Sequence, residues 1–190
     1  MSANPLFDET GALCGRGQSG KVWFLAGVFN ASGTAVRDEC EIPAGKALFV
    51  PILNGECSNV EGNGSSEAEW RACAAAQMAL ATDLSADIDG TPIRHVAQYR
   101  VQSPRAFGLR LPDNNILQLF GFDAPAGQCF PIGSSCVPYR SVADGYYLLL
   151  SPPRAGAHTI HVHGAIPAFG FTLDVTYHLK VRHGAGSEVE

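Results

Sequence analysis

The feature that most constrains the fold is a strict alternation of apolar and polar residues in two segments near the C-terminal end. In residues 171–181 every second position is apolar, and the positions between are Thr, Asp, His or Lys. In residues 157–163, Ile160 and Val162 alternate with His161 and His163. Successive side chains of a strand point to opposite faces, so each segment is predicted to be a strand with one buried face. Pairing must bring the apolar faces together, so we expect the two strands to be antiparallel neighbours. The residues expected on the buried side are Ile160, Val162, Leu173, Val175 and Tyr177.

The opposite face of this hairpin gathers most of the histidines and predicts a metal site. Histidines at positions i and i+2 lie about 6–7 Å apart on one strand face, a distance that two nitrogens about 2.0–2.1 Å from one Zn or Cu ion can span. His161 and His163 are therefore candidate ligands, with His178 or Asp174 from the second strand as the third. Asp174 can instead orient an imidazole from outside the coordination sphere. The alternative is that these are hydrogen-bonded histidines on an exposed sheet face.

The pair His161 and His163 resembles the first half of a cupin motif, in which two histidines at this spacing join a downstream glutamate and a later histidine around a metal. Residues 43–45, Pro-Ala-Gly, resemble the turn of the second cupin motif. Pro167 stands at the fourth position after His163, where no glutamate follows, and Leu48 stands where a histidine is expected. The resemblance implies a related fold and does not supply the full ligand set.

The rest of the chain is predicted to form short strands between Gly- and Pro-containing turns, interrupted by one helix. Ser66 followed by Glu69 forms a capping box, and apolar residues then recur at helical spacing, which predicts a helix over about 66–82. We expect an all-β fold, a two-sheet antiparallel β-sandwich or jelly roll with one inserted helix. A chain of 190 residues fits one such domain, here residues 21–182, with an irregular arm at 1–20 and a frayed tail at 183–190.

Six cysteines lie in loop-like contexts, and none forms a C-x-x-C pair. This pattern favours disulfides over a zinc ribbon. Fifteen pairings are possible, and we favour the local set Cys14–Cys40, Cys57–Cys73 and Cys129–Cys136. The alternative is six buried free thiols in a cytosolic protein. We expect a secreted, extracellular or periplasmic protein whose leader, absent from the start of the sequence, has been removed.

Charge and composition disfavour several classes of binding partner. The formal net charge is -5 and the 13 Lys and Arg residues are scattered, which disfavours nucleic acid and anionic membranes as partners. No apolar run is long enough to span a bilayer. The long irregular segment 112–141 carries aromatic residues that can form a stacking platform for sugars, but we favour a role in the core or in anchoring the loop. The aromatic residues of the strands and helix are expected mainly in the core. The segment's residues are Phe120, Phe122, Phe130 and Tyr139; those of the strands and helix are Trp23, Phe24, Phe49, Trp70, Tyr146 and Tyr147.

Two function classes follow from these observations. One is an exported protein with a divalent transition metal, Zn or Cu, on the histidine face, with or without catalysis on an extracellular substrate. The other is a non-catalytic module that binds a small molecule, a glycan or a partner chain, or serves in surface assembly. A carboxylate pair of the glycosidase type is a further possibility, but sequence spacing does not pair the candidates. Those candidates are Glu56, Asp113, Asp123 and Asp144.

Overall fold

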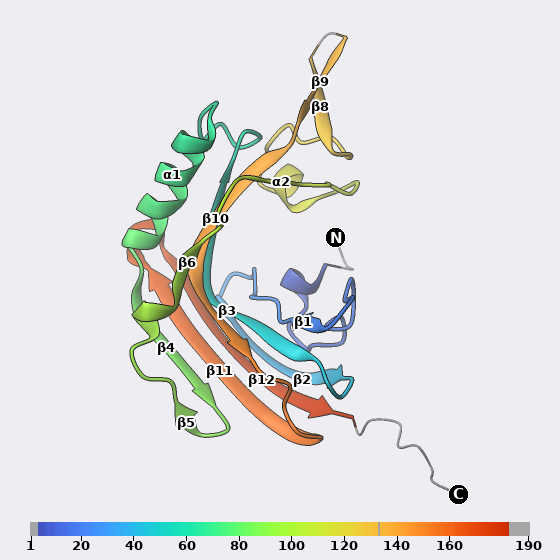
Figure 1. The fold of residues 1–190 in the computed structure, drawn as a ribbon, viewed down its shortest axis with the longest axis vertical. Helices are drawn as coiled ribbons and strands as arrows, with labels where there is room; N and C mark the ends of the chain where they lie inside the picture. Colours follow the sequence, from blue (N-terminus) through green and yellow to red (C-terminus); the bar gives the residue numbers. More distant parts are fainter. Residues whose placement is uncertain (1–3, 133, 183–190) are drawn as a thin grey trace, which may run out of the picture. The chain divides into compact units, whose positions relative to one another are not determined.

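The computed structural model describes residues 4–132 and 134–182, and β-strands are its main secondary structure (Figure 1). One five-stranded sheet has the order β1-β3-β10-β6, with β7 also paired to β10, and a second has the order β2-β12-β11-β4-β5. A separate hairpin is formed by β8 and β9. The predicted all-β, two-sheet sandwich with one inserted helix is thus confirmed. The strands are β1 (Val22–Phe24), β2 (Thr34–Ile42), β3 (Ala47–Ser58), β4 (Thr82–Ile88), β5 (Thr91–Pro92), β6 (Arg100–Gln102), β7 (Phe107–Gly108), β8 (Cys129–Ile132), β9 (Ser135–Pro138), β10 (Arg140–Leu150), β11 (Gly156–Ile166) and β12 (Phe171–Val181). The helices are α1 (Glu67–Ala79) and α2 (Ile116–Leu119), with single 3-10 turns at Pro5–Phe7, Val96–Tyr99 and Pro167–Phe169.

The chain divides into two compact units. Of the described residues, the first contains 54–80, 101–132 and 134–145, and the second contains 4–53, 81–100 and 146–182. The expected tail at 183–190 lies outside the described residues, as do residues 1–3 of the expected arm. No helix in the described ranges is long and apolar enough to cross a membrane.

The sandwich core of the second unit forms where the inward faces of the two sheets meet. Alternate residues of β3 are buried and so are the apolar residues of β11 and β12, as expected for strands with one dry face. Gly164 marks a close approach, since a Cβ placed there would lie 3.2 Å from the Leu53 Cβ of β3. Each large side chain buried here contributes about 1.5–3 kcal/mol. The fully or nearly fully buried residues are Leu48, Val50, Ile52, Leu148, Ile160, Val162, Val175, Tyr177 and Leu179.

The predicted hairpin register is confirmed. β11 and β12 are antiparallel, with Ile160 opposite Tyr177 and Val162 opposite Val175. The predicted inward residues, including Leu173, are all buried. The alternation of the two strands is sufficient to set this register because a shift by one residue would turn every apolar side chain outward.

The structure corrects one part of the prediction, because two strand pairings are parallel. β1 pairs with β3 in parallel and β2 pairs with β12 in parallel. Between β1 and β3 the chain passes through β2, which belongs to the other sheet, and this crossover brings the chain back in the same direction. The sandwich is therefore mixed and not purely antiparallel.

A buried arginine holds the N-terminal segment against β2 within the second unit. Arg37 of β2 is 2% exposed, and its guanidinium donates to the carbonyl oxygens of Pro5, Asp8, Ala26 and Gly27 at 2.5–3.0 Å. The same group lies 5.6 Å from the centre of the Tyr177 ring, a cation–π distance. Carbonyl oxygens thus solvate a charge that would otherwise be expensive to bury.

In the first unit, α1 covers the buried end of β3. Ser66 caps the helix, and the reciprocal bonds between Ser66 and Glu69 form the predicted capping box. The helix packs Trp70 and Ala74 against Cys57 and Val142. It spans Glu67–Ala79, shorter than the predicted 66–82, because the chain enters β4 at Thr82.

All six cysteines are paired, in the set favoured by the sequence. The disulfides are Cys14–Cys40, Cys57–Cys73 and Cys129–Cys136. One links the N-terminal segment to β2, one links β3 to α1, and one closes the β8–β9 hairpin. Such covalent links are typical of proteins in oxidising compartments.

Candidate functional site

The candidate site lies on the face of β11 and β12 that points away from the core. His163 is directly opposite Asp174, His161 is opposite Thr176, and Thr159 is opposite His178. Directly paired residues on one face have their Cβ atoms about 4.5–5.5 Å apart, and diagonal neighbours are within reach of long side chains. The three histidines and the aspartate therefore share one face, as the alternation predicts.

Asp174 joins the two histidines of β11. Its Oδ1 lies 3.0 Å from His161 Nε2 and its Oδ2 lies 3.1 Å from His163 Nδ1. The three side chains are 40%, 38% and 29% exposed for Asp174, His161 and His163. One carboxylate thus holds two imidazoles at a solvent-accessible surface. Among the described residues no hydrogen-bond partner is found for His161 Nδ1 or His163 Nε2.

The electrostatics of the cluster favour an ionised aspartate. Partial burial by itself would raise the pKa of Asp174, but the hydrogen bonds and charges of His161 and His163 together bring it below its ordinary value. A carboxylate that accepts from both rings places the proton of each ring on the nitrogen that faces Asp174. The lone pair of each neutral ring is then on the other nitrogen, which is the arrangement required of a metal ligand.

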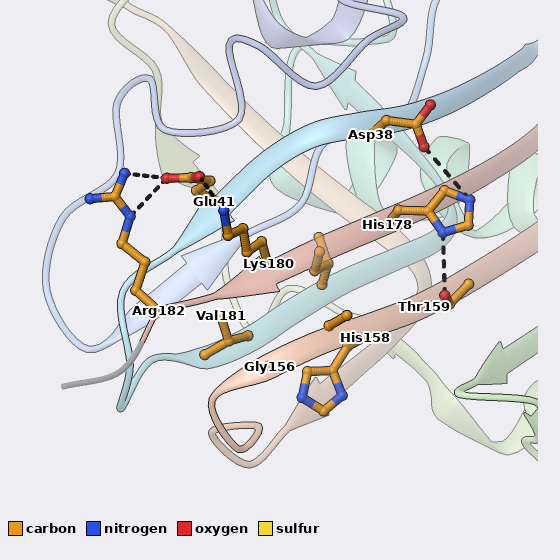
Figure 2. A pocket seen from close by; sticks show the side chains of 11 residues that line it. Asp38, Glu41, Gly156, His158, Thr159, His178, Lys180, Val181 and Arg182 are labelled. Atoms are coloured by element: carbon orange, nitrogen blue, oxygen red, sulfur yellow. Dashed lines mark hydrogen bonds and ion pairs between the residues drawn. The ribbon is translucent and has the colours of Figure 1, made fainter.

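His178 belongs to a different set of contacts. Its Nδ1 lies 3.3 Å from Thr159 Oγ1 and its Nε2 lies 3.7 Å from Asp38 Oδ1 of β2 (Figure 2). The structure therefore brings together three of the four predicted ligands and leaves His178 paired elsewhere. Residues 4–132 and 134–182 contain no group of three or more His, Cys, Asp or Glu side chains arranged to hold a metal ion. Metal ligation by these residues stays a prediction.

His178 lines a shallow groove of about 740 Å³ at the end of the β11–β12 hairpin (Figure 2). Glu41 of β2 pairs there with Arg182 and with Lys180, whose Nζ lies 3.4 Å from the carboxylate. The hydrogen bond from Arg182 is the main cause that lowers the pKa of Glu41. The positive charges of Lys180 and Arg182 thus offset the negative charge of Glu41 in the groove.

His158 forms a second imidazole–carboxylate pair that the sequence did not assign. Its Nδ1 lies 2.8 Å from Asp89 Oδ2, its Nε2 lies 2.9 Å from the Arg154 carbonyl oxygen, and Asp89 also accepts from the Thr159 amide. The hydrogen bond to the Asp89 carboxylate is the main cause that raises the pKa of His158. The sequence signal is Asp89-Gly90, whose left-handed backbone turns the chain from β4 into β5 and presents the carboxylate to β11.

One aromatic residue of the strands, Phe24, is exposed although the strand aromatics were expected mainly in the core. Trp23, Trp70 and Tyr146 are buried as predicted, but Phe24 is 53% exposed. Its ring lies 5.4 Å from that of Phe49, which in turn lies 5.2 Å from that of Tyr147. An aromatic row therefore crosses the outward side of β1, β3 and β10 in the second unit. Both sides of β1 are apolar, so alternation alone does not reveal which side is outward.

One aromatic residue of the long segment 112–141 is buried and one is exposed. Tyr139 is fully buried, its hydroxyl donates to the Pro125 carbonyl oxygen at 2.7 Å, and its ring stacks on Phe130 at 5.7 Å. Phe120 is 50% exposed. Tyr139 thus anchors the segment, as the favoured interpretation expects, while Phe120 is exposed.

Comparison of the chain with known protein families, curated proteins and solved structures finds no match.

Proposed function

We propose that this chain is an exported β-sandwich protein that binds a divalent transition metal, Zn or Cu, through His161 and His163. The observation that carries the proposal is the Asp174 carboxylate, which contacts both imidazoles and leaves the opposite nitrogen of each ring for a ligand. Carboxylate–histidine pairs of this kind fix the tautomer and raise the basicity of a ligating ring. Export is supported by three disulfides.

Two histidine ligands leave coordination positions for water or an external donor. A metal held this way polarises a bound carbonyl or lowers the pKa of bound water, so the site is compatible with metal-dependent hydrolysis as well as with metal capture. The protein's own contribution is the orientation of the two rings by Asp174. Imidazole must be neutral to coordinate, so metal affinity is expected to fall as the pH is lowered.

Calorimetric titration of chelator-treated protein with Zn²⁺ and Cu²⁺ tests the proposal. We expect one metal per chain bound tighter than about millimolar, loss of binding in the His161→Ala/His163→Ala double variant, and about 10- to 100-fold weaker binding in Asp174→Asn. The side chains are on the exposed face, so the double variant should keep its thermal unfolding temperature. His178→Ala is the matched control, because His178 contacts Thr159 and Asp38 instead. Full metal content in the double variant would refute the site.

A non-catalytic glycan-binding module is the second candidate. The aromatic row favours it, in which Phe24 is exposed and Phe49 and Tyr147 are half-buried. Aromatic faces stack on the apolar faces of sugar rings and lose little conformational entropy on binding. Affinity electrophoresis through gels that contain soluble polysaccharides tests this candidate, with Phe24→Ala and Tyr147→Ala as variants. Equal mobility with and without each polysaccharide would exclude it for the glycans tested.

A further inference from the structure

Glu56 of β3 is a partly buried acid in the first unit and is independent of the metal site. Its neighbours Gly55 and Cys57 face α1, where a Cβ on Gly55 would meet Gln77 and where Cys57 bonds Cys73. Alternation therefore directs Glu56 to the opposite face of the strand. There its carboxyl group accepts a hydrogen bond from the hydroxyl of Ser141 on β10, a residue with no exposed surface.

A second carboxyl group, that of Glu61, comes to the same place from the turn after β3. Glu61 Oε2 accepts from the hydroxyl of the buried Ser58 at 2.7 Å. Ser58 follows Glu56 by two residues on β3, so their side chains share one face of the strand and the Glu61 carboxyl group comes beside that of Glu56. Two carboxyl groups can share a hydrogen bond only while one of them keeps its proton.

The surroundings of Glu56 supply no compensating cation within the described chain. Glu61 is the charged group that acts on it, β10 supplies the Ser141 hydroxyl, and the adjacent Arg140 extends toward Gly108 of β7. α1 lies on the other face of the strand. Burial is the main cause that raises the pKa of Glu56, to about 8, and the negative charge of Glu61 adds to the effect.

We propose that Glu56 and Glu61 share one proton near neutral pH and form a pH-sensitive latch, which holds the turn 59–64 against β10 and releases it in alkaline solution. When the proton leaves, two adjacent carboxylates repel each other, and Glu61 is the one on a turn that can move away.

The latch keeps in place hydrogen bonds that the main chain and the asparagine side chains of the turn form. The Asn59 amide donates to the Arg140 carbonyl oxygen at 3.1 Å, and the Arg140 amide donates to Asn59 Oδ1 at 3.0 Å. The Ser58 amide donates to Asn63 Oδ1 at 3.0 Å. α1 stays in place when the turn opens, because the Cys57–Cys73 disulfide and the Ser66 cap hold it independently.

The raised pKa of Glu56 determines how the stability of the folded protein depends on pH. The folded pKa of Glu56 is above the ordinary glutamate value of 4.5, so the folded protein holds a proton that the unfolded chain has lost. The stabilising contribution is complete below pH 4.5 and declines as the pH rises through about 8. The latch is therefore closed in acid and at neutral pH and open in base.

The test follows the carboxyl carbon of Glu56 by NMR in glutamate-labelled full-length protein, together with thermal unfolding between pH 5 and pH 10. We expect Glu56 to titrate near pH 8 and the wild-type unfolding temperature to fall by about 5 °C or more between pH 6 and pH 9. Glu56→Gln mimics the protonated acid, so it should lose much of this fall and unfold at a higher temperature than wild type at pH 9. Glu61→Gln removes the repulsion by a second route and should shift the titration of Glu56 to lower pH. Glu39→Gln, an exposed change on β2, is the control and should behave as wild type.

Three results would overturn the proposal. One is a Glu56 that titrates below pH 5, and another is a Glu56→Gln variant whose pH profile matches that of wild type. The third is stabilisation by millimolar Ca²⁺ that chelator reverses and Glu56→Gln abolishes, since the two carboxylates would then hold a cation and not a proton.

Discussion

At the scale of single residues, carboxylates organise the imidazoles of β11. Asp174 holds His161 and His163, and Asp89 holds His158. Alternation along the strands predicts that Asp174 shares a face with the two histidines. It does not predict that each carboxylate oxygen selects one ring, because that depends on side-chain rotamers on two strands. Local sequence patterns do not reveal the Asp89 contact, because Asp89 lies 69 residues before His158 in the chain.

The His158–Asp89 pair gives a prediction with a defined pH window. The raised pKa of His158 makes its contribution complete below pH 6.5 and lost as the pH rises through the folded value, while the lowered pKa of Asp89 makes its contribution present above pH 3.8. Asp89→Asn should therefore destabilise the protein most between about pH 4 and 6.5, by about 1 kcal/mol or less because the pair is partly exposed. Thermal unfolding at pH 5 and pH 9 measures this, with Asp113→Asn as the control. An equal loss at both pH values would show that the charge pairing does not contribute.

At the scale of elements, features that depend on nearby residues could be predicted from the sequence, and pairings of distant segments could not. The β11–β12 register, the helix start at Ser66 and the three disulfides follow from residues close together in the sequence. The parallel pairing of β2 with β12 joins segments far apart, and alternation is the same for a parallel or an antiparallel neighbour. That pairing therefore had no signal in the sequence pattern. The jelly-roll assignment depends on the same long-range order and stays a prediction.

The start of α1 provides a test at this scale. The Ser66 hydroxyl accepts from the Glu69 amide and donates to the Glu69 carboxylate, which satisfies groups that the helix itself leaves unpaired. Ser66→Ala should cost about 1 kcal/mol in the free energy of unfolding. Urea denaturation measures the loss, and Ser19→Ala, in an exposed turn, should leave the midpoint unchanged. A Ser66→Ala midpoint equal to that of wild type would mean that the disulfide to Cys73 alone fixes the helix start.

At the scale of the whole molecule, apolar burial is divided unevenly between the two units, and each unit contains at least one disulfide. The second unit has a sandwich core in which β3, β11 and β12 bury their inward residues completely, whereas the first unit has a smaller cluster around Trp70 and Cys57. A small core supplies less stabilisation per residue, so a disulfide matters more there. The Cys57–Cys73 bridge lies in that small cluster.

We predict that all six cysteines of the native protein are oxidised to disulfides. Three disulfides predict an intact mass lower than that of the reduced chain by six hydrogens, two for each bond, and no thiol that reacts with an alkylating reagent before reduction. Loss of Cys57–Cys73 through a Cys57→Ala/Cys73→Ala double variant should cost about 2–4 kcal/mol, because it frees a 16-residue loop in the unfolded chain. The equivalent change at Cys129 and Cys136, separated by seven residues, should cost less because the freed loop is shorter. Mass spectrometry and urea denaturation of the purified protein measure both effects. Labelling of five or six thiols without reductant would contradict the pairing and remove the support for export.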